Sequence, residues 1–308
     1  MDITDAVSET ALVTLRARAI ESQRARPLID DPVGVELLGL LEQRLADDTR
    51  KRILHRRLPT ALSVHLALRG RQYDRYVERF RSEHENALVV SLGAGFDTRY
   101  FRISDEPWPY VEVDLTDVIA AKKELLGERA GYTMIGCSVL EDAWLEEVRA
   151  MQREHVLFLA EGLFMYLPRQ SVVDLFGKLA SSFTRCEIVF EVVREKYTRG
   201  IWKRMVDSKM KRSMGTKSAA TYESGVRTAR EVESYANGIE VVEEWSYLEA
   251  DDIRPSFMRL FRHLKSMTRS QWTIRATIGW SLMTPPDSAQ SSKAASPASP
   301  VAPGEVLG

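Results

Sequence analysis

Residues 87–99 read ALVVSLGAGFDTR, and this stretch decides the fold. The first six residues are almost all apolar and predict a buried strand that ends at Gly93. Gly93 and Gly95 then allow a tight turn, in which a ligand can approach the backbone amides at the carboxyl end of the strand. A glycine pair also serves plain strand-to-helix packing, so the turn by itself leaves both explanations open.

The residues after the turn narrow the choice of ligand. Thr98 stands where a dinucleotide-binding fingerprint has its third glycine, which argues against a pyrophosphate site. Asp114 ends the next predicted strand, nineteen residues after Gly95, where a carboxylate can accept hydrogen bonds from both hydroxyls of a ribose. The alternative for Asp114 is a helix N-cap ahead of Leu115. A ribose site without a pyrophosphate site favours S-adenosylmethionine over a nicotinamide cofactor.

Short apolar runs alternate with helical patterns around this turn. Helical spacing is found at about 117–126 and after Pro168. The alternation predicts right-handed crossovers and an α/β fold with a parallel, doubly wound sheet. Phe257, Leu260, Phe261 and Leu264 mark a later helix. The predicted strands after the first are 110–114, 132–136, 156–160, 187–193, 239–245 and 272–283.

Composition divides the chain into a cap, a core and a tail. Residues 1–85 carry helical patterns and predict an N-terminal cap within the same domain as the core, 86–283. The core contains a predicted helical insertion at 194–235. Residues 284–308 hold five of the twelve prolines and no aromatic residue, and we expect a disordered tail.

The overall charge excludes one class of partner. The 308 residues include 43 Lys and Arg against 44 Asp and Glu, which argues against a globally basic nucleic-acid binder. The absence of a long apolar run and of a signal peptide leads us to expect no membrane partner and a cytoplasmic protein. The two cysteines, Cys137 and Cys186, make neither a disulfide framework nor a metal site, so we expect no metal.

One segment departs from this balance. Residues 194–212 contain eight Lys or Arg and two Asp or Glu, interleaved with apolar residues at helical spacing. The pattern predicts one or two amphipathic helices. Their basic face is either simply solvated or binds a phosphate or an acidic partner.

Six separate motifs are similar to one known family. They are RAIES (18–22), PLIDDP (27–32), LRGRQYD (68–74), VVSLGAGFDTR (89–99), EVDL (112–115) and AEGLFMYL (160–167). Together they resemble the leucine carboxyl methyltransferase family, and within it the branch of tetracenomycin-type polyketide O-methyltransferases. The resemblance covers residues 10–195 well and 196–283 weakly. It implies a class I S-adenosylmethionine-dependent methyltransferase with a seven-stranded, mostly parallel sheet.

The resemblance also implies a role for individual residues. Arg69 would pair with the methionine carboxylate of the cofactor, as a guanidinium fork can; the alternative is a surface arginine. The backbone of Gly93, Ala94 and Gly95 would line the methionine and ribose, and Asp114 with Leu115 would hold the ribose.

Three further residues complete the implied cofactor site. Ser138 and Val139 would flank the adenine. The phosphatase-methylating branch has an aspartate in place of Ser138, which argues against a phosphatase substrate. Glu161 would lie near the sulfonium, the alternative being a buried carboxylate that caps the following turn.

The expected reaction is methyl transfer to an oxygen of a small molecule. An ionised carboxylate needs no general base, whereas a phenol does. We recognise no such base, because His155 and His263 are expected to be structural or exposed, so a carboxylate is favoured. Tyr166 and Arg194 follow the fourth and fifth predicted strands and could orient an acidic substrate. The alternative functions are a protein C-terminal carboxyl methyltransferase and a non-catalytic protein that binds an adenosyl ligand. The N-terminal cap and the insertion at 194–235 are expected to form the lid over the substrate site.

Overall fold

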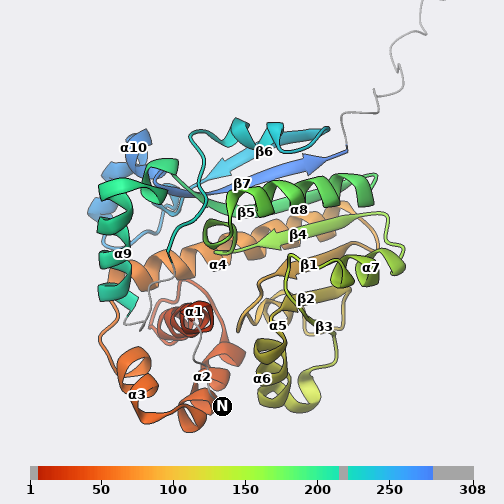
Figure 1. Ribbon diagram of the computed structural model, residues 1–308. Coiled ribbons are helices and arrows are strands. Elements are labelled where there is room, and N and C mark those ends of the chain that lie inside the picture. The colour runs from red at the N-terminus through yellow and green to blue at the C-terminus, as the bar shows by residue number, and fades with distance from the viewer. Residues whose placement is uncertain (1–5, 215–220, 280–308) are drawn as a thin grey trace, which may run out of the picture.

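A single mixed sheet forms the centre of the protein (Figure 1). The computed structural model describes residues 6–214 and 221–279. The strand order is β3-β2-β1-β4-β5-β7-β6, in which β1 to β5 pair in parallel and β7 runs antiparallel to both β5 and β6. This confirms the predicted α/β fold. The strands are β1 Leu88–Leu92, β2 Tyr110–Asp114, β3 Thr133–Gly136, β4 Val156–Ala160, β5 Cys186–Val193, β6 Ile239–Trp245 and β7 Gln271–Ile278.

The order of strands reverses next to β1. From β1 the chain goes outward through β2 to β3, and it then returns to the other side of β1 to form β4. Open α/β sheets bind ligands at such a switch point, outside the carboxyl ends of the strands. The glycine turn that follows β1 therefore lies where the fold offers a crevice.

Helices cover both faces of the sheet, because the central strands are apolar on both sides. On one face α4 (Thr60–Glu83) places Tyr73 and Val77 against Val89 and Leu157. On the other, α7 (Ala143–Ala150) and α8 (Arg169–Ser182) pack around Phe158. The remaining helices beside the sheet are α5 (Arg99–Ile103) and α6 (Thr116–Leu126).

Residues 6–54 supply a helical cap. It consists of α1 (Ala6–Ser22), α2 (Pro32–Arg44), α3 (Asp47–Thr49) and a π-helical turn, Arg50–Leu54. Leu12 and Leu37 share an apolar core with Leu125 of α6. Because the cap and the sheet layers share this core, we propose that they form one domain.

A helical excursion separates β5 from β6. It contains a 3-10 turn, Glu195–Thr198, then α9 (Gly200–Met214) and a second 3-10 helix, Ala229–Ser234. These helices lie inside the predicted insertion, 194–235. The predicted tail, 284–308, lies outside the described residues.

The helix expected after Pro168 is α8, and Pro168 is its N-cap. Two later elements differ more clearly from the sequence prediction. The helix expected around Phe257 is a 3-10 helix, Ser256–His263, followed by a short α10 (Lys265–Thr268), and its apolar pair Phe257 and Leu260 has the three-residue spacing that suits 3-10 geometry. The last strand ends at Ile278 because Gly279 turns the chain with a φ of +83°.

Candidate active site

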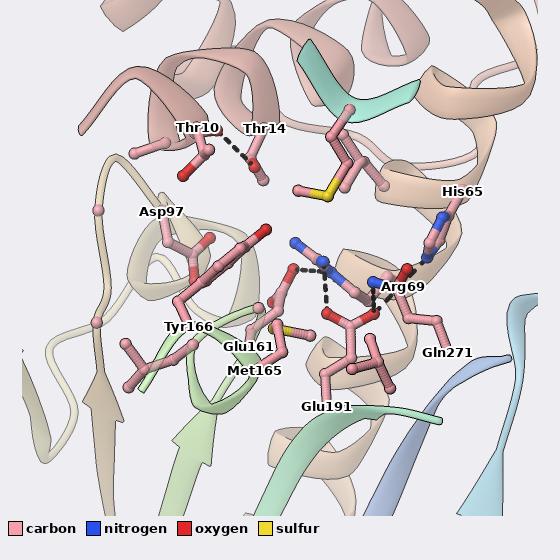
Figure 2. Close-up of a pocket in the computed structure, with 18 of the residues that line it drawn as sticks. Thr10, Thr14, His65, Arg69, Asp97, Glu161, Met165, Tyr166, Glu191 and Gln271 are labelled. Atoms are coloured by element: carbon pink, nitrogen blue, oxygen red, sulfur yellow. Dashed lines mark hydrogen bonds and ion pairs between the residues drawn. The ribbon is translucent and has the colours of Figure 1, made fainter. Parts of the chain in front are cut away.

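A cavity of about 590 Å³ lies beyond the carboxyl ends of the parallel strands. Its floor includes the glycine turn after β1 and the ends of β2, β4 and β5, while α1, α4 and α9 contribute the opposite walls. Figure 2 shows side chains of these elements converging on it. The expected lid elements, the cap and the insertion, both reach this cavity.

The glycine turn has a backbone that only glycine adopts easily. The φ angles of Gly93 and Gly95 are +63° and +52°. A Cβ atom on Gly95 would stand 2.9 Å from the Cβ of Ala11 on α1, and one on Gly93 would stand 2.8 Å from a methyl group of Leu163. Glycine is therefore required both for the turn and for the close approach of α1. Ala94, between the two glycines, also lines the cavity.

Asp114 ties the end of β2 to this turn. Its Oδ2 accepts a hydrogen bond from the Gly95 N–H at 2.6 Å, and its Oδ1 accepts one from the Leu115 N–H at 2.7 Å. Leu115 is the N-cap of α6, so the alternative role of Asp114 as that cap is wrong. Burial raises the pKa of Asp114, although both backbone donors oppose the shift. Asp114 and Leu115 both line the cavity.

The residues expected near an adenine lie at the same end of the cavity. Ser138 and Val139 follow β3 and line the wall, together with Cys137. The hydroxyl oxygen of Ser138 accepts a hydrogen bond from the Leu140 N–H at 3.2 Å, which leaves the hydroxyl proton free to be donated.

Arg69 is the centre of a buried ionic cluster. Its Nε donates to Glu161 Oε1 at 2.9 Å and its Nη1 donates to Glu191 Oε2 at 2.7 Å. The residue is 6% exposed, so the surface-arginine alternative is wrong. Burial alone would lower the pKa of Arg69, but the two carboxylates hold it above its usual value. Among the described residues, Nη2 of Arg69 has no hydrogen-bond partner.

The two glutamates are each held by a further side chain. Arg99 donates to Glu161 Oε2 at 2.6 Å, and Gln271 donates to Glu191 Oε1 at 2.8 Å. His65 Nε2 lies 3.7 Å from the same Glu191 oxygen, and the His65 ring stacks on Tyr247. Figure 2 shows Arg69, His65 and Gln271 gathered around the two glutamates, below the open centre of the cavity.

A second set of ion pairs supports the turn from behind. Arg18 of α1 donates to the Phe96 carbonyl at 2.8 Å and to Asp31 at 2.9 Å. Burial would raise the pKa of Asp97, yet the surrounding cations, Arg99 foremost, hold it well below its usual range. Charges buried with this many hydrogen bonds restrain the turn in one geometry.

The part of the cavity beneath α9 is aromatic and apolar. Tyr166 and Tyr222 have ring centroids 5.8 Å apart, and Met165, Val206 and Met210 lie with them on the wall. In Figure 2 the Tyr166 hydroxyl points into the cavity. Burial and the charge of Glu191 raise the pKa of Tyr166, so its hydroxyl stays protonated and can donate a hydrogen bond.

Arg194 does not fit its predicted position. Its side chain is not among those lining the cavity, and its backbone N–H donates to the Ser270 carbonyl at 3.0 Å. The backbone pairing that continues past β5 therefore turns Arg194 away from the substrate wall, and we do not retain it as a substrate contact.

Sequence reasoning missed His65 and Glu191. His65 precedes Arg69 by four residues on one helix, a spacing that puts both side chains on the same face. Glu191 is a buried carboxylate in a strand whose other residues, apart from Glu187, are apolar, and buried acids are rare unless paired. The two histidines that were considered lie elsewhere: His155 stacks on His84, and His263 is exposed.

Comparison with known proteins places these residues in a family context. The sequence model described as leucine carboxyl methyltransferase matches residues 11–180. The tetracenomycin polyketide synthesis O-methyltransferase TcmP of Streptomyces glaucescens is 32% identical over 81% of this chain and 87% of its own length. The S-adenosyl-L-methionine-dependent methyltransferase dpfgK of Gibberella zeae is 28% identical over 57% of this chain and 61% of its own.

Solved structures resemble the chain more distantly. Magnesium protoporphyrin IX methyltransferase (ChlM) from Synechocystis PCC 6803, solved with bound SAH, has a TM-score of 0.44 and 12% identity. That match covers 75% of this chain and 93% of the other.

Proposed function

This chain belongs to the leucine carboxyl methyltransferase family and is an S-adenosyl-L-methionine-dependent methyltransferase, and we propose that it methylates an oxygen of a small aromatic acid or phenol. The observation that carries the proposal is the contact between Asp114 and Gly95 at the carboxyl end of β1. It joins a glycine turn to a ribose-type carboxylate at the switch point of the sheet.

The residues on the wall fit the parts of S-adenosylmethionine. Ser138 and Val139 would face the adenine, Asp114 and Leu115 the ribose, and the backbone of Gly93 to Gly95 the methionine. Arg69 would hold the methionine carboxylate through Nη2, the nitrogen that Glu161 and Glu191 leave available. Glu161 would add a negative charge near the sulfonium.

The reaction asks mainly for alignment. When bound, S-adenosylmethionine supplies a methyl group on positively charged sulfur, which an oxygen nucleophile displaces in line. The Tyr166 hydroxyl would orient the substrate oxygen by donating a hydrogen bond. The aromatic and methionine side chains beneath α9 would pack against a flat, apolar substrate and exclude water.

The structure adds a candidate general base. No general base is recognisable in the sequence, which favours a carboxylate nucleophile, but in the structure His65 lies on the cavity wall beside Glu191. A histidine in this position could accept a proton from a phenol. A hydroxyl nucleophile is therefore proposed on equal terms with a carboxylate.

Calorimetry followed by a methyl-transfer assay tests the proposal. We expect S-adenosylmethionine and S-adenosylhomocysteine to bind and NAD and NADP not to bind. With a panel of aromatic acids and phenols, labelled methyl groups should appear as base-labile esters or as stable ethers. Binding of the adenosyl ligands without transfer to any member of the panel would contradict the substrate class but not the cofactor.

A further inference from the structure

Large exposed apolar side chains gather on two segments of this protein. Among the described residues ten large apolar side chains are exposed, and seven of them lie in α9 or in Ser256–Thr268. Scattered exposed apolar residues need no explanation, but a concentration of this kind marks an interaction surface. The seven are Ile201, Trp202, Met205, Phe257, Leu260, Leu264 and Met267.

Helix α9 is apolar on two opposite sides. Met210 is buried and, with Val206, lines the cavity. On the outer side Ile201 is 70% exposed and Met205, one turn later, is 57% exposed. The inner side is explained by the cavity, whereas the outer side has no such explanation.

The 3-10 helix Ser256–His263 repeats this arrangement. Met258 and Phe261 pack inward against the apolar cluster that contains Leu248. Phe257 and Leu260, three residues apart, share the outward side and are 60% and 74% exposed. The segment therefore also presents an apolar stripe to its surroundings.

Unpaired positive charges accompany both stripes. Six exposed cations on these segments have no ion-pair partner among the described residues, and no Asp or Glu occurs between 254 and 270. Elsewhere cations are commonly paired, as Arg269 is with Glu244 and Glu249. The six are Arg204, Lys209, Lys211, Arg212, Arg259 and Lys265.

The chain just before α9 and the chain just after α10 are joined beside the substrate cavity. The Arg194 N–H, ahead of α9, bonds to the Ser270 carbonyl, just after α10. Lys209 of α9 and Gln271 of β7 line the same cavity. Figure 1 shows α9 and α10 on the same side of the sheet.

We propose that these two segments dock the protein on the surface of a lipid bilayer that contains anionic headgroups. Amphipathic segments that combine Trp, Phe and Leu with Lys and Arg insert their apolar side chains at the headgroup boundary, while the cations face the phosphates. A second copy of this chain is a poorer occupant, because pairing this surface with itself would place its cations against one another. An acidic protein would match the charge, but lysine is depleted at protein interfaces, and Lys209, Lys211 and Lys265 belong to the cationic set.

Docking on a bilayer would let apolar molecules pass between the membrane and the substrate cavity. Methylation of an ionised oxygen removes its charge, so the product partitions into hydrocarbon more readily than the substrate. This part of the argument rests on the proposed function, whereas the docking itself does not. No helix of the described residues is long and apolar enough to cross a membrane. The proposed contact is peripheral, and it replaces the expectation from the sequence that the protein has no membrane partner.

Flotation with extruded vesicles tests the docking. The full chain is mixed with vesicles of phosphatidylcholine alone or with one quarter phosphatidylglycerol, at low and high salt. We expect binding to the anionic vesicles, weakened by salt, and a blue shift of tryptophan emission that Trp202→Ser abolishes. Lys211→Gln with Arg259→Gln should weaken partitioning about 30-fold, since each cation contributes about 1 kcal/mol.

Apolar variants and a matched control complete the test. Trp202→Ser with Leu260→Ser should reduce binding at least about 10-fold, while Val242→Ser, an exposed apolar residue of β6, should leave it unchanged. The docking proposal would be overturned if the protein did not bind anionic vesicles, or if Val242→Ser lost as much vesicle binding as the double variants. Binding to a polyglutamate probe but not to vesicles would overturn it as well. S-adenosylhomocysteine affinity, measured on the same samples, reports separately on the cofactor site.

Discussion

Replacing Arg69 by methionine separates the structural role of this residue from its proposed role in binding. Methionine keeps most of the side-chain length but removes the charge. Glu161 keeps Arg99 as a partner, whereas Glu191 keeps only the Gln271 amide and His65. The main consequence should therefore fall on Glu191, which is 2% exposed.

The size of the effect follows from leaving a buried carboxylate without its cation. Removing one partner of a buried ion pair typically costs about 3–5 kcal/mol. The loss should depend on pH. Burial has the largest single effect and raises the pKa of Glu191, but in the native protein Arg69, together with His65 and Gln271, holds this pKa below its ordinary value. The pair thus stabilises the fold above the ordinary carboxyl pKa, and this contribution is lost as the pH falls.

Without Arg69, burial raises the pKa of Glu191 and favours the neutral acid in the folded state. The variant should then lose stability as the pH rises, opposite to the contribution in the native protein. Urea unfolding at pH 5 and pH 8 measures this, with Arg75→Met, an exposed change on the same helix, as control.

The second substitution Glu191→Gln distinguishes the two roles. In the Arg69→Met background it should restore most of the stability, because no buried charge is left unpaired. It should not restore S-adenosylhomocysteine affinity, because the guanidinium is still missing. Undiminished affinity in Arg69→Met would refute the binding role, and no recovery by Glu191→Gln would refute the electrostatic account.

Three further changes test the rest of the site. Asp114→Ala should weaken S-adenosylhomocysteine binding about 10- to 100-fold by calorimetry, as loss of charge-assisted hydrogen bonds does; an equal effect of Asp117→Ala, on the exposed side of α6, would contradict this. Gly95→Ala should lower the free energy of unfolding in urea by about 2–4 kcal/mol, because the backbone strain at positive φ and the steric clash with Ala11 both contribute. Gly200→Ala, with a φ of +57° and no atom within 4 Å of the added Cβ, should cost only the strain, so equal losses would contradict the contact argument. Tyr166→Phe should lower kcat/KM about 10-fold at unchanged cofactor affinity, and a parallel loss of affinity would remove its assignment to the substrate.

Local patterns were enough to predict the core of the fold. Strand β4 lies at 156–160, as its apolar run predicts, and β1 and β2 end at the expected residues. This worked because parallel strands buried on both faces appear as continuous apolar runs. The helix expected around Phe257 is present, and only the structure shows that it is a 3-10 helix, because apolar spacing in a short segment does not separate 3-10 from α geometry.

The candidate site was predictable where its residues follow strand ends. The glycine turn, Asp114, Ser138 and Glu161 all line the cavity because each stands at, or just after, the carboxyl end of a parallel strand of one sheet. His65 was missed because a helix face becomes a cavity wall only through packing. Arg194 was misplaced because its position depends on the antiparallel pairing of β7 with β5.

The amino-acid sequence by itself determined the sheet, the glycine turn and the family, since these depend on neighbours in the chain. Only the tertiary structure decided which charges neutralise one another. Arg69 meets Glu191 across 122 residues, whereas Lys211 of α9 and Arg259 of the 3-10 helix form no ion pair with an acid among the described residues. The near-equal totals of 43 cations and 44 anions contain no such information, because an ion pair depends on distance in space and not on composition.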